Sequence, residues 1–373
     1  MRISWILPEA EYAGGTKVIA IYCEQLMASG HEVVVISTPM QPWSLRRLLR
    51  SFFRNGRLPI QPKRRPTYFD ETCIDHRVID KARSINDNDI PDGDLVIATW
   101  WETARAVNAL SRSKGTKVYF MQDYGAPGME LEDLIPTWRL PLYIITISQF
   151  LVDLMHKHVG KIPVDLVGNS VDSEQFHAPP RGKSAIPTVG YLYRAEWVKG
   201  SDIVLKAVRL ARNEIPNLRL LAYGPRKKPG ERPIPKGMDY RLFPANDELK
   251  FIYASCDAWL FASRTEGFGL PILEAMACRT PVIATPAGAA PELITAQNGG
   301  VLIDHESPEQ MAREIVRFCK MEESEWQVIS AAALKTSTTY TWDEAGRQFE
   351  ESLKRAYEID APKRKADVDA LQS

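Results

Sequence analysis

The chain has 373 residues, which at roughly 150 residues per domain suggests two domains or slightly more. Hydrophobic residues make up 45% and charged residues 25% of it, an ordinary globular composition. Lys+Arg and Asp+Glu both number 47, so no overall electric field favours nucleic acid as a partner. The five cysteines are scattered without CxxC spacing, which indicates reduced thiols rather than a disulfide framework or a zinc site. We therefore expect a cytoplasmic protein.

The first 38 residues alternate in the order strand, loop, helix, strand. The apolar run at 2–7 is followed by a loop, by a segment of helical spacing that ends at Gly30, and by the apolar run HEVVVIST. This order predicts a βαβ unit and hence a parallel sheet. Further buried strands are predicted at 94–99, 117–122, 143–148 and 164–169.

The same alternation begins again after a polar, proline-containing stretch at 179–187. Two consecutive doubly wound halves predict a two-domain α/β protein with a cleft between the halves. We assign residues 1–170 to the first domain and 171–342 to the second. A helix is predicted at about 343–359, and a flexible polar tail at 360–373.

The most informative segment is a glycine-rich turn flanked by Glu266 and Glu274. Gly267 and Gly269 lack a Cβ, so backbone N–H groups of this turn can come close to a ligand. The next residues predict a helix whose positive end faces the turn, which favours an anion there. The Glu274 carboxylate, one turn inside that helix, can accept hydrogen bonds from the two hydroxyls of a ribose. The layout fits a sugar nucleotide, while a buried helix with capping carboxylates remains the alternative.

This segment, EGFGLPILEAMACRTPVIATPAGAAPELI, resembles the Glu-x7-Glu segment of the family-four (group 1) retaining glycosyltransferases. The resemblance implies the GT-B fold: two Rossmann-like doubly wound domains face a central cleft, the first on the acceptor side and the second binding the nucleotide sugar. It implies that the 343–359 helix packs back on the first domain. It also implies that Glu274 holds the ribose and Glu266 meets the transferred sugar, while the backbone of Gly267, Phe268, Gly269 and Leu270 faces the phosphates and the sugar.

Two cations are expected on a loop at the carboxyl edge of the second sheet. Arg194 and Lys199 follow the strand predicted at 188–193 and resemble the family's Arg-x4-Lys-Gly phosphate clamp. Such a clamp would stabilise a departing diphosphate, so we expect neither a metal nor a cofactor. We interpret DND at 87–89 and DGD at 92–94 as turn residues rather than metal ligands.

Gly14 and Gly15 lie in the first strand-to-helix loop. This loop lacks the GxGxxG pattern of dinucleotide-binding enzymes, and the resemblance instead implies that it approaches the diphosphate and the sugar. A plain tight turn is the alternative. Tyr223 lies at the end of one predicted strand and Phe243 in the next, and the resemblance implies that these strand edges flank the nucleobase. They do not distinguish uracil from guanine or thymine.

The chain departs from the family pattern in its first domain. Many family members have a histidine where this chain has Gln122 and Asp123. Asp123 is our candidate for contacting the donor sugar or an acceptor hydroxyl, with a structural turn cap as the alternative. Asn169 to Phe176 resemble the family's interdomain junction, with Ser170 in place of its glycine.

Residues 46–65 contain eight lysines and arginines interleaved with Leu48, Leu49, Phe52 and Phe53. They form either a solvated surface or a basic amphipathic patch in peripheral contact with anionic headgroups or a diphosphate-lipid acceptor. In the second case the protein would work at the inner face of the membrane.

The residues and the resemblance together predict an enzyme that moves a hexose or deoxyhexose from a nucleoside diphosphate to a hydroxyl of a glycan or lipid-linked acceptor. The expected setting is polysaccharide biosynthesis. A glycan phosphorylase, a nucleotide-sugar epimerase and a non-catalytic sugar-nucleotide-binding scaffold are the alternatives.

Overall fold

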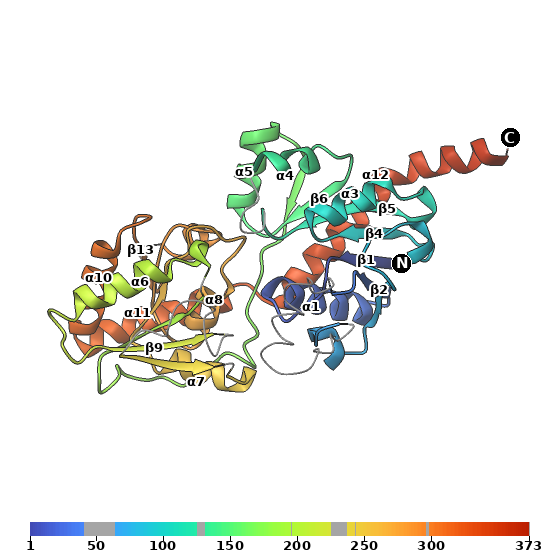
Figure 1. The fold of residues 1–373 in the computed structure, drawn as a ribbon. Coiled ribbons are helices and arrows are strands. Elements are labelled where there is room, and N and C mark those ends of the chain that lie inside the picture. Colours follow the sequence, from blue (N-terminus) through green and yellow to red (C-terminus); the bar gives the residue numbers. More distant parts are fainter. Residues whose placement is uncertain are drawn as a thin grey trace, which may run out of the picture.

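The computed structural model describes residues 1–40, 64–124, 131–194, 196–224, 237–242, 244–295 and 298–372. Figure 1 shows two lobes, with the N-terminal strands in one and α6 to α11 in the other. Each lobe contains one parallel sheet. Within the described residues, no helix is both long and apolar enough to cross a membrane.

The sheet of the first lobe has seven strands in the order β3-β2-β1-β4-β5-β6-β7, all paired in parallel. Apolar side chains bury the central strands, and Leu95 to Ala98 are all buried. Its strands are β1 (Arg2–Leu7), β2 (Glu32–Ser37), β3 (Asp75–Val78), β4 (Leu95–Ala98), β5 (Thr116–Met121), β6 (Tyr143–Thr146) and β7 (Val164–Leu166). Its helices are α1 (Gly14–Ala28), η1 (Tyr68–Glu71), η2 (Asp87–Asp89), α3 (Trp101–Ala109), η3 (Arg112–Lys114), α4 (Leu131–Trp138) and α5 (Gln149–Val159).

The sheet of the second lobe has six parallel strands in the order β10-β9-β8-β11-β12-β13. Its strands are β8 (Thr188–Leu192), β9 (Arg219–Gly224), β10 (Met238–Leu242), β11 (Ala258–Phe261), β12 (Val282–Ala284) and β13 (Gly300–Leu302). Its helices are η4 (Trp197–Lys199), α6 (Ser201–Ala211), η5 (Asn246–Glu248), α7 (Leu249–Ala254), α8 (Leu270–Ala277), α9 (Ala290–Leu293), α10 (Pro308–Lys320) and α11 (Glu323–Thr338). The two sheets confirm the predicted pair of doubly wound α/β halves.

The last helix, α12 (Trp342–Gln372), returns to the first lobe, where it contacts α1 and β5. Phe349 of this helix stacks on Trp5 of β1 and on Tyr22 of α1, with ring centroids 5.6 and 4.3 Å apart. The helix extends past the 343–359 range expected from the sequence, and residues 360–372 are helical rather than a tail without structure. Alanine, lysine, arginine and leucine after Pro362 favour helix, which explains the extension.

The loops that follow β1 and β5 in the first lobe meet the turn that follows β11 in the second lobe. In doubly wound sheets, ligands bind beyond the carboxyl ends of the strands because the connecting loops leave a crevice there. The loops after β1, β5, β8 and β11 carry most of the predicted site residues.

Candidate active site

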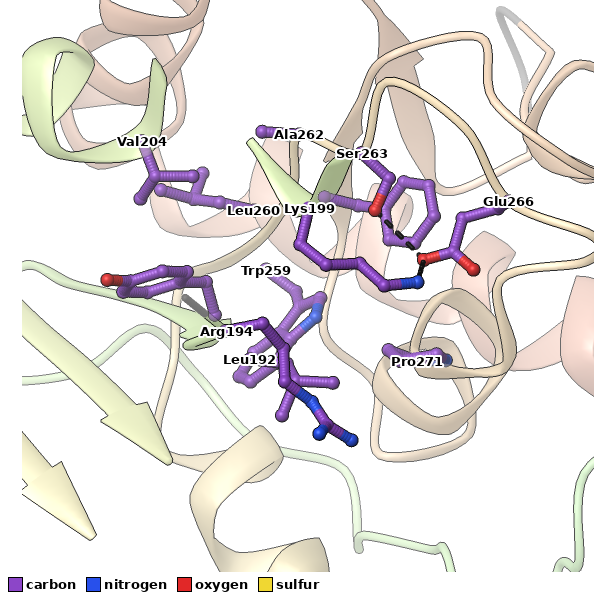
Figure 2. Close-up of a pocket in the computed structure, with 12 residues that line it drawn as sticks. Leu192, Arg194, Lys199, Val204, Trp259, Leu260, Ala262, Ser263, Glu266 and Pro271 are labelled. Atoms are coloured by element: carbon purple, nitrogen blue, oxygen red, sulfur yellow. Dashed lines mark hydrogen bonds and ion pairs between the residues drawn. The ribbon is translucent and has the colours of Figure 1, made fainter. Parts of the chain in front are cut away.

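Arg194, Lys199 and Glu266 line one pocket in the second lobe (Figure 2). The Lys199 ammonium lies 2.6 Å from Glu266 Oε1, and Ser263 Oγ donates to the same oxygen over 2.9 Å. Pro271, in the first turn of α8, also lines the pocket. The structure therefore brings the two predicted cations and one predicted glutamate to the start of α8.

The chain around Lys199 is held by a glycine. Gly200 has a φ of 64°, and a Cβ on it would stand 1.9 Å from the carbonyl oxygen of Ala262. Only glycine fits this left-handed position against the end of β11. Ser201 at the start of α6 donates to the Arg194 carbonyl oxygen over 2.6 Å. These contacts fix the loop between β8 and α6 that carries both cations.

The glycine-rich turn is built as a helix entry. Gly269 is the N-cap of α8 with a φ of 102°, and the helix begins at Leu270. Pro271 lies in the first turn of the helix, where its fixed φ is already helical and its missing N–H costs no hydrogen bond. Phe268 is buried and its carbonyl oxygen accepts from the Ala289 N–H over 2.8 Å, so the turn is tied to the segment before α9.

The turn lies against the first lobe. A Cβ on Gly267 would stand 1.8 Å from the carbonyl oxygen of Gln122, so the two backbones touch. Ser148 Oγ, at the start of α5, donates to the Gly267 carbonyl oxygen over 2.7 Å. A Cβ on Gly14 would lie 3.6 Å from Leu270, so α1 and α8 begin close together across the interlobe region. The positive ends of two helices therefore converge on one place, which favours an anion there.

Gly15 contacts Gln122, one of the two residues that stand where the resembling family often has a histidine. The Gln122 side chain donates to the Gly15 carbonyl oxygen over 3.2 Å. The loop after β1 is thereby joined to the loop after β5. Asp123 is consequently held beside the glycine-rich loops of both lobes.

Asp123 retains exposed surface, yet the surrounding loops remove water from its carboxyl group. This desolvation raises the pKa of Asp123 to about 6, with the negative charge of Glu266 acting in the same direction. The Tyr124 N–H, which donates to Asp123 Oδ1 over 2.8 Å, and the charge of Lys199 oppose the increase. Asp123 thus belongs electrostatically to the same cluster as Lys199 and Glu266, although it comes from the other lobe.

Glu274 lies in a separate cavity on the other side of the α8 start. Tyr253 donates its hydroxyl to Glu274 Oε2 over 2.6 Å, and the Tyr223 hydroxyl lies 2.8 Å from that of Tyr253. Burial raises the pKa of Glu274, while Lys17 and the Tyr253 hydrogen bond lower it. Tyr223 was expected beside the nucleobase. The structure buries its side chain and places its hydroxyl against that of Tyr253, so its place beside a nucleobase stays a prediction.

Some predicted residues cannot be placed. Phe243 and residues 46–63 of the basic segment lie outside the described residues. The two remaining members of that segment are paired within the protein: Arg64 with Asp70, and Arg65 with Glu9 and Glu11.

The aspartates at 87–94 serve local structure. Asp89 pairs with Arg83 over 2.6 Å, and Asp92 with Lys114 over 2.9 Å. Over the part of the chain that the structure describes, no three His, Cys, Asp or Glu residues are grouped to hold a metal ion.

Sequence reasoning missed four polar residues of the site: Lys17, Ser148, Tyr253 and Ser263. Lys17 could have been found, because it lies three residues after Gly14 and hence on the same side of α1. Ser263 also had a local signal, three residues before Glu266. Ser148 and Tyr253 had none, since 119 residues separate Ser148 from Gly267 and 21 separate Tyr253 from Glu274.

Comparison with known proteins agrees with this geometry. Residues 172–335 match the family model described as Glycosyl transferases group 1. A D-inositol 3-phosphate glycosyltransferase of Segniliparus rotundus is 28% identical over 203 residues, which is 48% of this chain and 44% of that protein. The chain thus spans less than half the length of this relative.

Solved structures share the fold over nearly the whole chain. HepE of Anabaena, in complex with UDP and glucose, has a TM-score of 0.71 at 17% identity and covers 95% of this chain and 100% of its own. Sucrose-phosphate synthase of Thermosynechococcus elongatus has a TM-score of 0.69 at 14% identity, with 96% and 100% covered. The fold is GT-B. The match to the group 1 glycosyltransferases covers the second lobe, residues 172–335.

Proposed function

We propose that this protein is a retaining glycosyltransferase that moves a hexosyl or deoxyhexosyl group from a nucleoside diphosphate to a hydroxyl of a glycan or lipid-linked acceptor. Polysaccharide biosynthesis is the proposed setting. The observation that carries the proposal is the shared pocket of Arg194, Lys199 and Glu266 at the start of α8. The two cations and the N–H groups at the start of α8 suit a diphosphate, and the Glu266 carboxylate suits the hydroxyls of the attached sugar.

The leaving diphosphate gains negative charge as its bond to the sugar breaks. Arg194 and Lys199 neutralise that charge, and the N–H groups at the start of α8 add fixed dipoles. These groups do the work that a metal ion performs in other transferases, so we propose that transfer needs no metal. Because Lys199 is already bonded to Glu266, its ammonium is positioned before the substrate arrives.

The transferred sugar lies beyond the diphosphate, next to Glu266. This carboxylate accepts hydrogen bonds from the sugar hydroxyls and stabilises positive charge at the reacting carbon. The acceptor oxygen forms its bond to that carbon on the face where the bond to the diphosphate breaks, and its proton passes to the departing diphosphate oxygen, so the anomeric configuration is retained. Above pH 6 the ionised Asp123 can receive a hydrogen bond from the acceptor hydroxyl.

A first experiment is a thermal-shift screen of UDP, GDP and dTDP with their hexose and deoxyhexose conjugates. A ligand at 100 times its Kd stabilises the folded state by about 2.7 kcal/mol, which raises the Tm by several degrees. No shift with any of these nucleotides contradicts the proposal.

The donor found in this screen is then offered to glycan and polyprenyl-linked acceptors, and NMR coupling constants report the anomeric configuration of the product. An inverted product refutes retention, and loss of transfer in EDTA refutes metal independence. A requirement for free phosphate identifies a phosphorylase, and an isomerised donor without acceptor identifies an epimerase. Nucleotide binding without any turnover identifies a scaffold.

A further inference from the structure

A second cavity lies between the lobes, next to the pocket of Lys199 and Glu266. It is lined by Lys17 of α1, by Leu270 and Glu274 of α8, and by Asp172 and Phe176 of the segment that joins the lobes. Leu270 lines this cavity while its neighbour Pro271 lines the other, so the start of α8 separates the two. A ligand held at that helix start can extend into both.

Lys17 is held in this cavity by neutral groups. Its ammonium donates to Gln175 Oε1 over 2.9 Å and lies 5.2 Å from the centre of the Phe176 ring. Among the described residues, no carboxylate lies within ion-pair distance of it. The positive charge therefore stays available to the cavity.

The groups that face Glu274 come from six elements of the structure. They are Lys17 of α1, Tyr68 of η1, Asp172 of the joining segment, Tyr223 of β9, Tyr253 of α7 and Cys278, which directly follows α8. Burial raises the pKa of the three tyrosines, and that of Cys278 to about 12, so all four are neutral near pH 7. Lys17 is then the one cation of this set, and it opposes the effect of burial on Glu274.

We propose that Lys17 is a donor-positioning residue: from the first lobe, it keeps the Glu274 carboxylate of the second lobe charged and thereby able to accept the ribose hydroxyls of the donor. This inference rests on the proposed function. It makes nucleotide binding a property of both lobes, since the cation and the carboxylate come from opposite sides of the cavity. Tyr253 donates a hydrogen bond to Glu274 Oε2, and the ribose hydroxyls donate hydrogen bonds to the other carboxylate oxygen.

The test compares the wild type with Lys17→Met, Lys17→Arg and Lys206→Met. Lys206 pairs with Glu309 on the surface of α6 and serves as the matched control. The Kd of UDP and GDP is measured by calorimetry from pH 5.5 to 8. For Lys17→Met we expect binding to weaken more at pH 5.5 than at pH 8, because a smaller fraction of Glu274 is ionised at the lower pH once the charge of Lys17 is gone. Lys17→Arg restores the wild-type profile.

A Lys17→Met profile that runs parallel to the wild type, or that Lys17→Arg fails to restore, overturns the inference. Infrared titration of the free protein gives a readout without nucleotide, with Glu274→Gln assigning the carboxyl band. The Glu274 band should titrate at higher pH in Lys17→Met, and an unchanged titration also overturns the inference. Failure of the wild type to bind any nucleoside diphosphate instead overturns the proposed function.

Discussion

Replacing Gly267 with alanine should separate the donor turn from the first lobe. The new Cβ would stand 1.8 Å from the Gln122 carbonyl oxygen, whereas real Cβ atoms do not come closer than 3.0 Å. Both partners are backbone, so neither can rotate away. The turn and the loop after β5 must therefore move apart by about 1 Å or more.

A displacement of that size should lower the rate of transfer because it also moves Asp123 away from Glu266. Misplacement by about 1 Å can lower a rate about 100-fold, which corresponds to about 2.7 kcal/mol in the activation free energy. We expect kcat/KM to fall by this factor, with most of the loss in kcat and with a Tm close to that of the wild type. Steady-state kinetics with the donor found in the nucleotide screen measures this loss.

Gly168→Ala is the matched control. Its Cβ would meet only the Tyr340 ring at 3.7 Å, an ordinary contact, so kcat/KM should stay within about twofold of the wild type. Equal activity of Gly267→Ala and Gly168→Ala would refute the view that the touching backbones of the two lobes set the reacting geometry.

Lys199→Ala should lower turnover about 100- to 1,000-fold, as removal of one preorganised donor does elsewhere, with little change in circular dichroism; near-normal turnover would contradict its role. Asp123→Asn should remove the loss of wild-type activity that we expect as the pH falls below about 6, which a pH–rate profile tests. The raised pKa of Asp123 favours the folded state below the unfolded pKa, and this contribution is lost as the pH rises through 6. Asp123→Asn should therefore raise the Tm at pH 8 more than at pH 4, and the opposite order would be inconsistent with its desolvation. Phe349→Ala should lower the free energy of unfolding by about 3–5 kcal/mol in urea, because it empties the space between Trp5 and Tyr22; a loss below 1 kcal/mol would show that α12 contributes little.

The sequence predicted the features whose physical causes are local. The apolar runs of the central strands are buried on both faces, and the glycines at 267 and 269 stand where a Cβ would collide. The edge strands were harder to detect. β3 has the alternately exposed sequence DHRV and no apolar run, so periodicity did not reveal it.

Features that depend on tertiary contacts were not predictable from one sequence. The chain of hydroxyls from Tyr223 through Tyr253 to Glu274 exists because β9, α7 and α8 pack together. Nothing in the spacing of these residues indicates that contact. The resemblance implied only that Tyr223 flanks the nucleobase and gave no sign of this hydroxyl contact.

The chain passes between the lobes twice, once after β7 and once before α12. Ser170 Oγ in the first passage donates to the Tyr340 carbonyl oxygen in the second over 2.6 Å. Two interlobe connections that are hydrogen-bonded to each other act as a single hinge. Such a hinge permits rotation of one lobe about one axis and resists twisting and sliding of the lobes. Ser170 also lines the cavity of Lys17 and Glu274, so the joint between the two connections lies directly beside that cavity.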